Sequence, residues 1–99
     1  MTAELTVIRW RDIPAQVVAK DGRKAAKFQL EARFQEAIDL AASRAGLIGS
    51  DDYLAEWQRD SRPCGDDLQA EVDAEVARIE DVHTDDVLAA LARAGGVGG

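Results

Sequence analysis

The sequence is poor in the residues from which catalytic and metal sites are usually built. Its 99 residues include one Cys and one His, which excludes a disulfide within the chain and leaves no repeated ligand spacing for a metal ion. The single Cys favours a reducing, cytoplasmic setting. There is no glycine-rich phosphate loop, and no apolar run approaches the roughly 20 residues that span a membrane. The sequence therefore predicts no cofactor, no metal ion and no membrane segment.

What the chain does contain suits one folded domain, with 46% hydrophobic and 31% charged residues. We expect that domain to span residues 1–94 and to be followed by a disordered glycine-rich tail at residues 95–99. The net charge is −7, but it is divided unevenly. Residues 1–49 carry eight basic and six acidic side chains, whereas residues 50–99 carry four basic and thirteen acidic ones. This acidic balance argues against nucleic acid as the main ligand.

The N-terminal segment predicts a β-hairpin. Residues 4–11 alternate in character and are rich in β-branched and aromatic side chains, which is typical of a strand. Pro14 interrupts this run because proline has no amide hydrogen to donate, and residues 16–20 form a second short strand. Asp21 and Gly22 supply the turn that closes the hairpin.

A helical period follows over residues 24–45 and predicts a long helix of about 30 Å. Its apolar positions fall on one core-facing stripe, formed by Leu30, Phe34, Ala37, Ile38, Ala41 and Ala45. Gly46 is the expected left-handed residue that ends the helix. Leu40 lies off the stripe, so it is either packed beneath the following loop, which we favour, or exposed to a partner.

The middle of the chain is partly ambiguous. Ser50 is a good N-cap for a short helical turn, and Asp51 and Asp52 place carboxylates where the helix dipole favours them. Residues 54–62 either continue as helix or form a third strand, at an edge of the sheet, that ends at Pro63. The strand is favoured because two strands alone make a marginal sheet.

Two acidic helices are predicted in the last third of the chain. The first begins at residues 65–67, and its apolar side comprises Leu68, Val72, Val76, Ile79 and Val82. Its other sides carry acids, among them Glu71, Asp73, Glu75 and Glu80. The second is capped by Thr84 and runs from Asp85 to about Ala94, with Val87, Leu88 and Leu91 as its contacts.

Cys64 is the best candidate for reactivity, although a weak one. A thiol just before a helix N-terminus is favoured as thiolate by the dipole, but Asp66 and Asp67 at the same place oppose that effect. His83 lies at the far end of the same predicted helix, roughly 24–28 Å away, so the two cannot form a Cys–His pair within one chain. A packed Cys64 and a capping or core role for His83 are the favoured interpretations.

A basic cluster is the first candidate for binding. Arg23, Lys24 and Lys27 stand at the start of the predicted long helix, where they can hold an anion. The alternative, which we favour, is a solvated basic edge that faces the acidic half of the chain.

The second candidate is centred on Trp10, which stands between two arginines. Aromatic and Arg side chains are enriched at interface hot spots, so an exposed strand here would be a docking edge. That edge would comprise Trp10, Arg11, Asp12, Ile13, Pro14 and Gln16. Packing of Trp10 in the core is the favoured alternative.

Four stretches of the sequence also carry a family resemblance: Arg9–Val17 (RWRDIPAQV), Arg33–Asp39 (RFQEAID), Tyr53–Leu54 with Trp57, and Pro63–Asp67 (PCGDD). Over residues 4–80 the chain resembles the small bacterial virulence factor domain family, which is similar to a terminal module of the larger conserved virulence factor C proteins. The matching positions without assigned roles are Arg11, Asp12, Pro14, Gln16 and Cys64. The resemblance implies an accessory subunit for corrinoid- and folate-dependent one-carbon enzymes, and no reaction of its own.

Together these patterns predict one α+β domain, in which a small antiparallel sheet packs against one long helix and one or two acidic helices follow. Because no acid, base and ligand atoms converge, the predicted function is a non-catalytic accessory or adaptor domain that binds a protein partner. We expect the contacts at residues 10–16 and in the basic segment Lys20–Lys27. The alternative is a small thiol-dependent or anion-binding enzyme component centred on Cys64.

Overall fold

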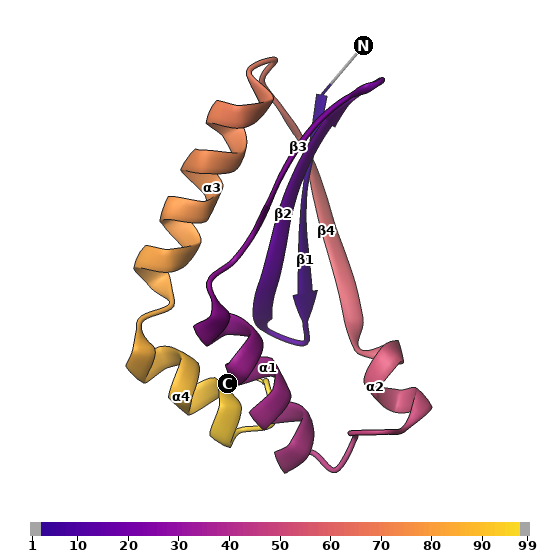
Figure 1. The fold of residues 1–99 in the computed structure, drawn as a ribbon, viewed down its shortest axis with the longest axis vertical. Coiled ribbons are helices and arrows are strands. Elements are labelled where there is room, and N and C mark those ends of the chain that lie inside the picture. Colours follow the sequence, from indigo (N-terminus) through magenta and orange to yellow (C-terminus); the bar gives the residue numbers. More distant parts are fainter. Residues whose placement is uncertain (1–2, 98–99) are drawn as a thin grey trace.

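Four strands form one antiparallel sheet in the order β3-β2-β1-β4 in the computed structural model, which describes residues 3–97 (Figure 1). The strands are β1 (Ala3–Trp10), β2 (Ile13–Asp21), β3 (Lys24–Gln29) and β4 (Trp57–Cys64). The helices are α1 (Ala32–Arg44), α2 (Asp51–Ala55), α3 (Leu68–Val82) and α4 (Asp85–Arg93). The predicted α+β class is confirmed, with four strands rather than three.

Strands β1 and β2 form the predicted hairpin, with one correction at Pro14. This residue lies inside β2 and does not separate the two strands. The register shifts between Ile8 and Arg9, so that Ile8 pairs with Gln16 and Arg9 with Pro14, and Ala15 is the extra residue. Such a bulge is one of the places where a sheet tolerates proline.

Residues 24–29 form strand β3, where the sequence predicted the start of a helix. Gly22, with φ 60°, turns the chain back along β2, and β3 pairs with β2 from Lys24 to Gln29. Ala and Lys favour helix locally, but the backbone hydrogen bonds that β2 offers along its free side decide the outcome. Helix α1 is therefore only 13 residues long, and Gly46, with φ 71°, ends it as predicted.

The main cover of the sheet is α3, and α1 contributes less than predicted. Helix α3 runs along one face of the sheet and packs on β2 and β3, with fewer contacts to β1 (Figure 1). Helix α1 contacts β2 but packs mostly against α4, at one end of the sheet. The predicted apolar side of α3 is buried except for Val82, which is 54% exposed.

Strand β4 resolves the ambiguity of residues 54–62 in favour of the edge strand. It pairs with β1 from Ala3–Cys64 to Trp10–Trp57, so it continues one residue past Pro63. The short helix α2 precedes it, with Ser50 in the N-cap position. The Ser50 hydroxyl donates a hydrogen bond to the Leu47 carbonyl oxygen at 2.7 Å and does not cap the helix.

The largest fully buried side chains are Trp10, Phe34, Leu5, Ile13, Ile38, Val17 and Val72. They come from the sheet, α1 and α3, so both ends of the chain contribute to one core. Leu40 is 48% exposed, against the prediction that it packs beneath the following loop. Leu40 lines a shallow hollow between α1 and α4 and is covered there only in part.

The disordered tail predicted at residues 95–99 is corrected for Gly95 and Gly96, which are buried. The Asp12 amide donates to the Gly96 carbonyl oxygen at 2.9 Å. Gly96 has φ 92°, and a Cβ atom there would lie 2.8 Å from the Trp10 ring, so only glycine fits. The chain after α4 therefore closes over the β1–β2 turn, while residues 98–99 lie outside the described residues.

Candidate functional site

The two faces of the sheet differ in what covers them. Side chains alternate along a strand, so Leu5, Val7 and Arg9 point toward α3, while Thr6 and Ile8 point away from it. This alternation is the one predicted from the sequence. We call the side toward α3 the groove face and the opposite side the open face.

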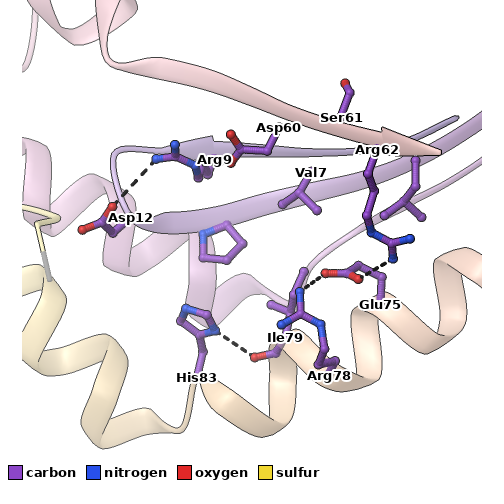
Figure 2. Close-up of a pocket in the computed structure, with 12 residues that line it drawn as sticks. Val7, Arg9, Asp12, Asp60, Ser61, Arg62, Glu75, Arg78, Ile79 and His83 are labelled. Carbon is purple, nitrogen blue, oxygen red and sulfur yellow. Dashed lines mark hydrogen bonds and ion pairs between the residues drawn. The ribbon is translucent and has the colours of Figure 1, made fainter. Parts of the chain in front are cut away.

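The groove is a cavity of about 340 Å³ between α3 and strands β1 and β4 (Figure 2). It exists because α3 packs over β2 and β3 and leaves the β4 side of this face uncovered. Leu5, Val7, Pro14 and Ile79 give it an apolar lining, and charged side chains surround them.

The charged groups of the groove are paired with one another. Arg9 donates a hydrogen bond from Nε to Asp60 and forms an ion pair with Asp12 at 3.8 Å. The hydrogen bond that Arg9 donates to Asp60 raises the pKa of Arg9 and lowers the pKa of Asp60. At the other end of the groove, Arg62 and Arg78 both bind one carboxylate.

That carboxylate is Glu75, which is 5% exposed, although the sequence placed it among the acids on the outer sides of the helix. Arg62 reaches it from β4 at 3.0 Å, and Arg78 reaches it from the next turn of α3. Burial pushes the pKa of Glu75 upward, but the hydrogen bonds from Arg78 and Arg62 outweigh it and hold the pKa below its usual range. Glu75 therefore ties α3 to the free edge of the sheet.

His83 and Cys64 lie at opposite ends of α3, as expected from the sequence. His83 is the C-cap residue of α3, and its Nδ1 donates a hydrogen bond to the Ile79 carbonyl oxygen at 2.9 Å. Its ring lies 5.9 Å from the ring of Phe34, which fits the predicted capping and core role. Burial, followed by the charge of Glu71, raises the pKa of the Cys64 thiol.

The contacts of the groove engage its charged side chains with one another. The three arginines are balanced by Asp12, Asp60 and Glu75, and the only thiol has a raised pKa. Within residues 3–97, no three His, Cys, Asp or Glu side chains are grouped so that they could hold a metal ion. The chemistry visible here is that of a structural ion-pair network.

The predicted docking edge needs a correction, because three of its six residues are buried. Trp10 and Ile13 are fully buried, Pro14 is buried too, and β2 is an interior strand of the sheet. The Trp10 indole donates a hydrogen bond to the Tyr53 carbonyl oxygen at 2.9 Å. Trp10 therefore packs in the core, as the favoured alternative stated, and Ile13 packs there with it.

Arg11 and Asp12 have contacts within the chain that account for their places in the motif. Arg11, with φ 51°, lies over the Trp10 ring at 5.1 Å and donates to the Gly95 carbonyl oxygen at 2.9 Å. Its guanidinium also pairs with Glu56 at 3.3 Å. The turn from β1 to β2 thus holds the chain segment that follows α4.

Gln16 is the remaining member of the predicted edge, and it lies on the open face. The strand pairs place the side chains of this face in three rows that cross the sheet from β3 to β4. The rows are Ala25–Lys20–Glu4–Pro63, Lys27–Val18–Thr6–Ser61, and Gln29–Gln16–Ile8–Arg59. Figure 2 shows Ser61 pointing away from the groove, on the opposite side of β4 from Arg62 and Glu75.

Two hollows mark the open face. One of about 370 Å³ extends over Thr6, Val18 and Lys27, and a second of about 400 Å³ extends toward Trp57. Both are lined by Ile8, Gln16 and Arg59. None of the helices within residues 3–97 covers the centre of this face, which Figure 1 shows bare along the upper sheet.

The predicted anion site at Arg23, Lys24 and Lys27 lacks the helix N-terminus on which it depended. Arg23 lies in the turn between β2 and β3, and the two lysines lie in β3. The alternation of β3 sends Lys27 to the open face and Lys24 to the other side. The basic segment therefore contributes separate charges to two sides of the sheet.

The family comparison agrees with the motifs placed above. A family described as "Virulence factor" matches residues 8–92. The chain belongs to the virulence factor family. The match runs from within β1 to within α4, so it extends beyond the residue 80 limit expected from the sequence motifs and includes the last helix.

No curated protein and no solved structure matches this virulence factor domain. None of the helices described for the domain combines the length and the apolar character that crossing a membrane requires. The motif positions Arg11, Asp12 and Pro14 support the fold, and Gln16 alone of the predicted edge has its side chain on the open face.

Sequence reasoning missed two residues, one on each face of the sheet. Arg59 joins the open face only if residues 57–64 form a strand, which the sequence left ambiguous. Glu75 is buried, whereas Asp73 and Asp81 on the same helix are exposed. Its spacing of three residues from Val72 and four from Ile79 puts it on the apolar side of the helix, and that spacing was the available signal.

Proposed function

We propose that this virulence factor domain is a non-catalytic accessory domain that binds a protein partner through the open face of its sheet. The observation that supports this proposal is the uncovered face itself, with Ile8 and Val18 at its centre and polar side chains around them. A partly apolar centre within a polar rim is the usual anatomy of a protein interface.

The absence of a catalytic role is supported by the pairing of charges in the groove. A nucleophile needs a base within hydrogen-bond reach, and Cys64 and His83 stand at opposite ends of the 15-residue α3. The raised pKa of Cys64 also disfavours its thiolate form. No contact of the described residues favours the alternative of an enzyme component centred on Cys64.

The family resemblance adds a class of partner to this proposal. It implies that the domain serves a larger corrinoid- or folate-dependent enzyme of one-carbon transfer, and such an enzyme would supply the chemistry that this domain lacks. A cytoplasmic setting belongs to the same proposal, on the strength of the single cysteine.

Site-specific photo-crosslinking in the source cell tests the proposal. A benzophenone amino acid is placed at Gln16 on the open face and, in a second variant, at Ala77 on the exposed side of α3. We expect one discrete crosslinked protein from position 16 and none from position 77. Identification of that protein by mass spectrometry then tests the one-carbon assignment.

The matched controls are the Cys64→Ala and His83→Ala variants with the same photo-crosslinker at position 16. Both should form the position 16 adduct at the wild-type level. Crosslinking from position 77 only, or loss of the position 16 adduct in Cys64→Ala, would contradict the proposal.

A further inference from the structure

We propose that the open face recognises an acidic protein surface, with carboxylates that contact Lys27 and Arg59 and an apolar side chain that contacts Ile8 and Val18 between them. This inference rests on the proposed function and specifies the chemistry of the partner. It is carried by the different pairing of the arginines on the two faces of the sheet.

On the groove face every arginine has an acidic partner. Arg9 pairs with Asp60 and Asp12, and Glu75 holds both Arg62 and Arg78. On the open face the side chains of Lys20, Lys27 and Arg59 make no ion pair or hydrogen bond within residues 3–97. These three cations of the open face thus have no ion-pair partner among the described residues, in a chain whose net charge is −7.

The strand register places these cations around an apolar centre. Lys27 on β3 lies directly across from Val18 on β2, and Arg59 on β4 lies directly across from Ile8 on β1. Adjacent strands are about 4.8 Å apart, so Lys27 and Arg59 are separated by three intervals, or about 14 Å across the sheet. A single strand or helix of a partner can therefore reach both cations while it covers Ile8 and Val18.

Lys20 contributes less positive charge to the open face than Lys27 and Arg59 do. It lies directly across from Glu4, the one acid on this face among the described residues, so its charge is partly offset there. The remaining positive charge lies at Lys27 and Arg59, toward the two edges of the sheet. An acidic partner is favoured at such a surface, and a basic one is repelled.

A protein surface fits this face better than a nucleic acid does. Binding through phosphates needs a clear excess of basic groups, whereas the chain as a whole carries a net charge of −7. A second copy of the chain would have to present its acidic α3 to this face, and such a head-to-tail contact gives a ring or a filament rather than a twofold dimer. Both occupants are outcomes of the experiment that follows.

Nuclear magnetic resonance titration with a synthetic probe tests the inference. The probe is an acetylated nine-residue peptide of alternating Glu and Val, and its counterpart has Lys in place of Glu. We expect the acidic peptide to shift the resonances of Ile8, Val18, Lys27 and Arg59, and the basic peptide to leave them unchanged. Raising the salt concentration should weaken the acidic complex.

The decisive variant is the double substitution Lys27→Glu with Arg59→Glu. It should weaken binding of the acidic peptide at least tenfold and allow the basic peptide to bind, since two attractions become repulsions. The control is Arg44→Glu with Arg93→Glu, which changes the net charge equally at the last turns of α1 and α4. That control should bind the acidic peptide within threefold of the wild type.

Three results would overturn the inference. They are equal responses to both peptides, tighter binding of a single-stranded DNA 20-mer at the same residues, and self-association that the Lys27→Glu and Arg59→Glu pair abolishes. If the crosslink from position 16 still forms in that double variant, the proposed function stands and the acidic chemistry of the partner is wrong. If position 16 gives no crosslink at all, the proposed function itself fails.

Discussion

The two faces of this sheet are built from the same four strands but differ in the burial and the ion pairs of their side chains. On the groove face, Leu5 is buried against the core and Arg9 and Arg62 are both paired with carboxylates. On the open face, Ile8 is only half-buried and Arg59 has no acidic partner among the described residues. The arginines of the groove face are paired within the described residues, and the arginine of the open face is not.

This difference shows that the groove face stabilises the fold and that the open face is left to solvent. A buried charge is tolerated only when it is paired, which explains why Glu75 keeps two arginines beside it. An antiparallel sheet can leave one face to solvent at no such cost. The open face is therefore free to vary its charge for recognition, and it carries cations in an acidic chain.

The largest expected effect is on the free energy of unfolding, when two residues of β1 are compared. Leu5→Ala on the groove face should lower the free energy of unfolding by about 2–5 kcal/mol, because it opens a cavity in the core. Ile8→Ala on the open face should lower it by about 1 kcal/mol or less, because Ile8 is already partly exposed. Urea denaturation of both variants provides the measurement. Equal losses would mean that the open face is as much a part of the core as the groove face.

The next largest effect is the loss of stability in a Glu75 variant, and it depends on pH. Because the pKa of Glu75 lies below its usual range, its ion pairs stabilise the fold above pH of about 4.3, and this stability is lost as the pH falls through the lowered value. Glu75→Gln should therefore lower the free energy of unfolding by about 1–2 kcal/mol at pH 7. The loss is not larger because both arginines are exposed to solvent.

Urea unfolding at pH 7 and at pH 3 checks this prediction, with Asp81→Asn on the exposed side of α3 as the control. The gap between wild type and Glu75→Gln should narrow at pH 3, and Asp81→Asn should stay within about 0.5 kcal/mol of the wild type. If the difference in the free energy of unfolding between wild type and Glu75→Gln became larger at pH 3, the ion pairs of Glu75 would not be the source of the stability.

The third prediction compares thiols on the two faces of β4. Cys64 lies on the groove side with a raised pKa, so maleimide labelling at pH 7 should be slow. A cysteine introduced by Ser61→Cys in a Cys64→Ala background lies on the exposed open face and should react several-fold faster. Faster labelling of Cys64 would show that it is a reactive thiol and would support a functional role for it.

The smallest expected effect is on stability at the open face. Lys27→Glu with Arg59→Glu should change the free energy of unfolding by no more than about 0.5 kcal/mol, because neither side chain has a partner to lose within residues 3–97. Thermal unfolding followed by circular dichroism is sufficient to measure this. A larger loss would show that these cations support the fold.

The sequence predicted the elements whose patterns are local. The alternation of β1, the stripe of α3, the stop at Gly46 and the family motifs are all confirmed. Strand β3 could not be predicted, because its Ala and Lys content favours helix and only the pairing with β2 overrides that preference. The same holds for Gly96, whose conformation depends on Trp10, a residue far away along the chain.

The candidate site was predicted only in part, for a related reason. Gln16, Lys20 and Lys27 were named from composition, but Trp10 and Ile13 were grouped with them because a strand pattern does not show what covers it. Arg59 joins the site through pairing between β1 and β4, which are distant in sequence. The open face becomes visible only when the register of all four strands is known.

Lysine acetylation of the domain, free and in complex with the partner identified by crosslinking, tests the central claim most directly. The chain has three lysines, of which Lys20 and Lys27 lie on the open face and Lys24 lies on the other side of β3. The account predicts that the partner protects Lys27 strongly and Lys20 in part, while Lys24 reacts as in the free domain. Protection of Lys24 with Lys27 left reactive would place the partner on the groove face and contradict it.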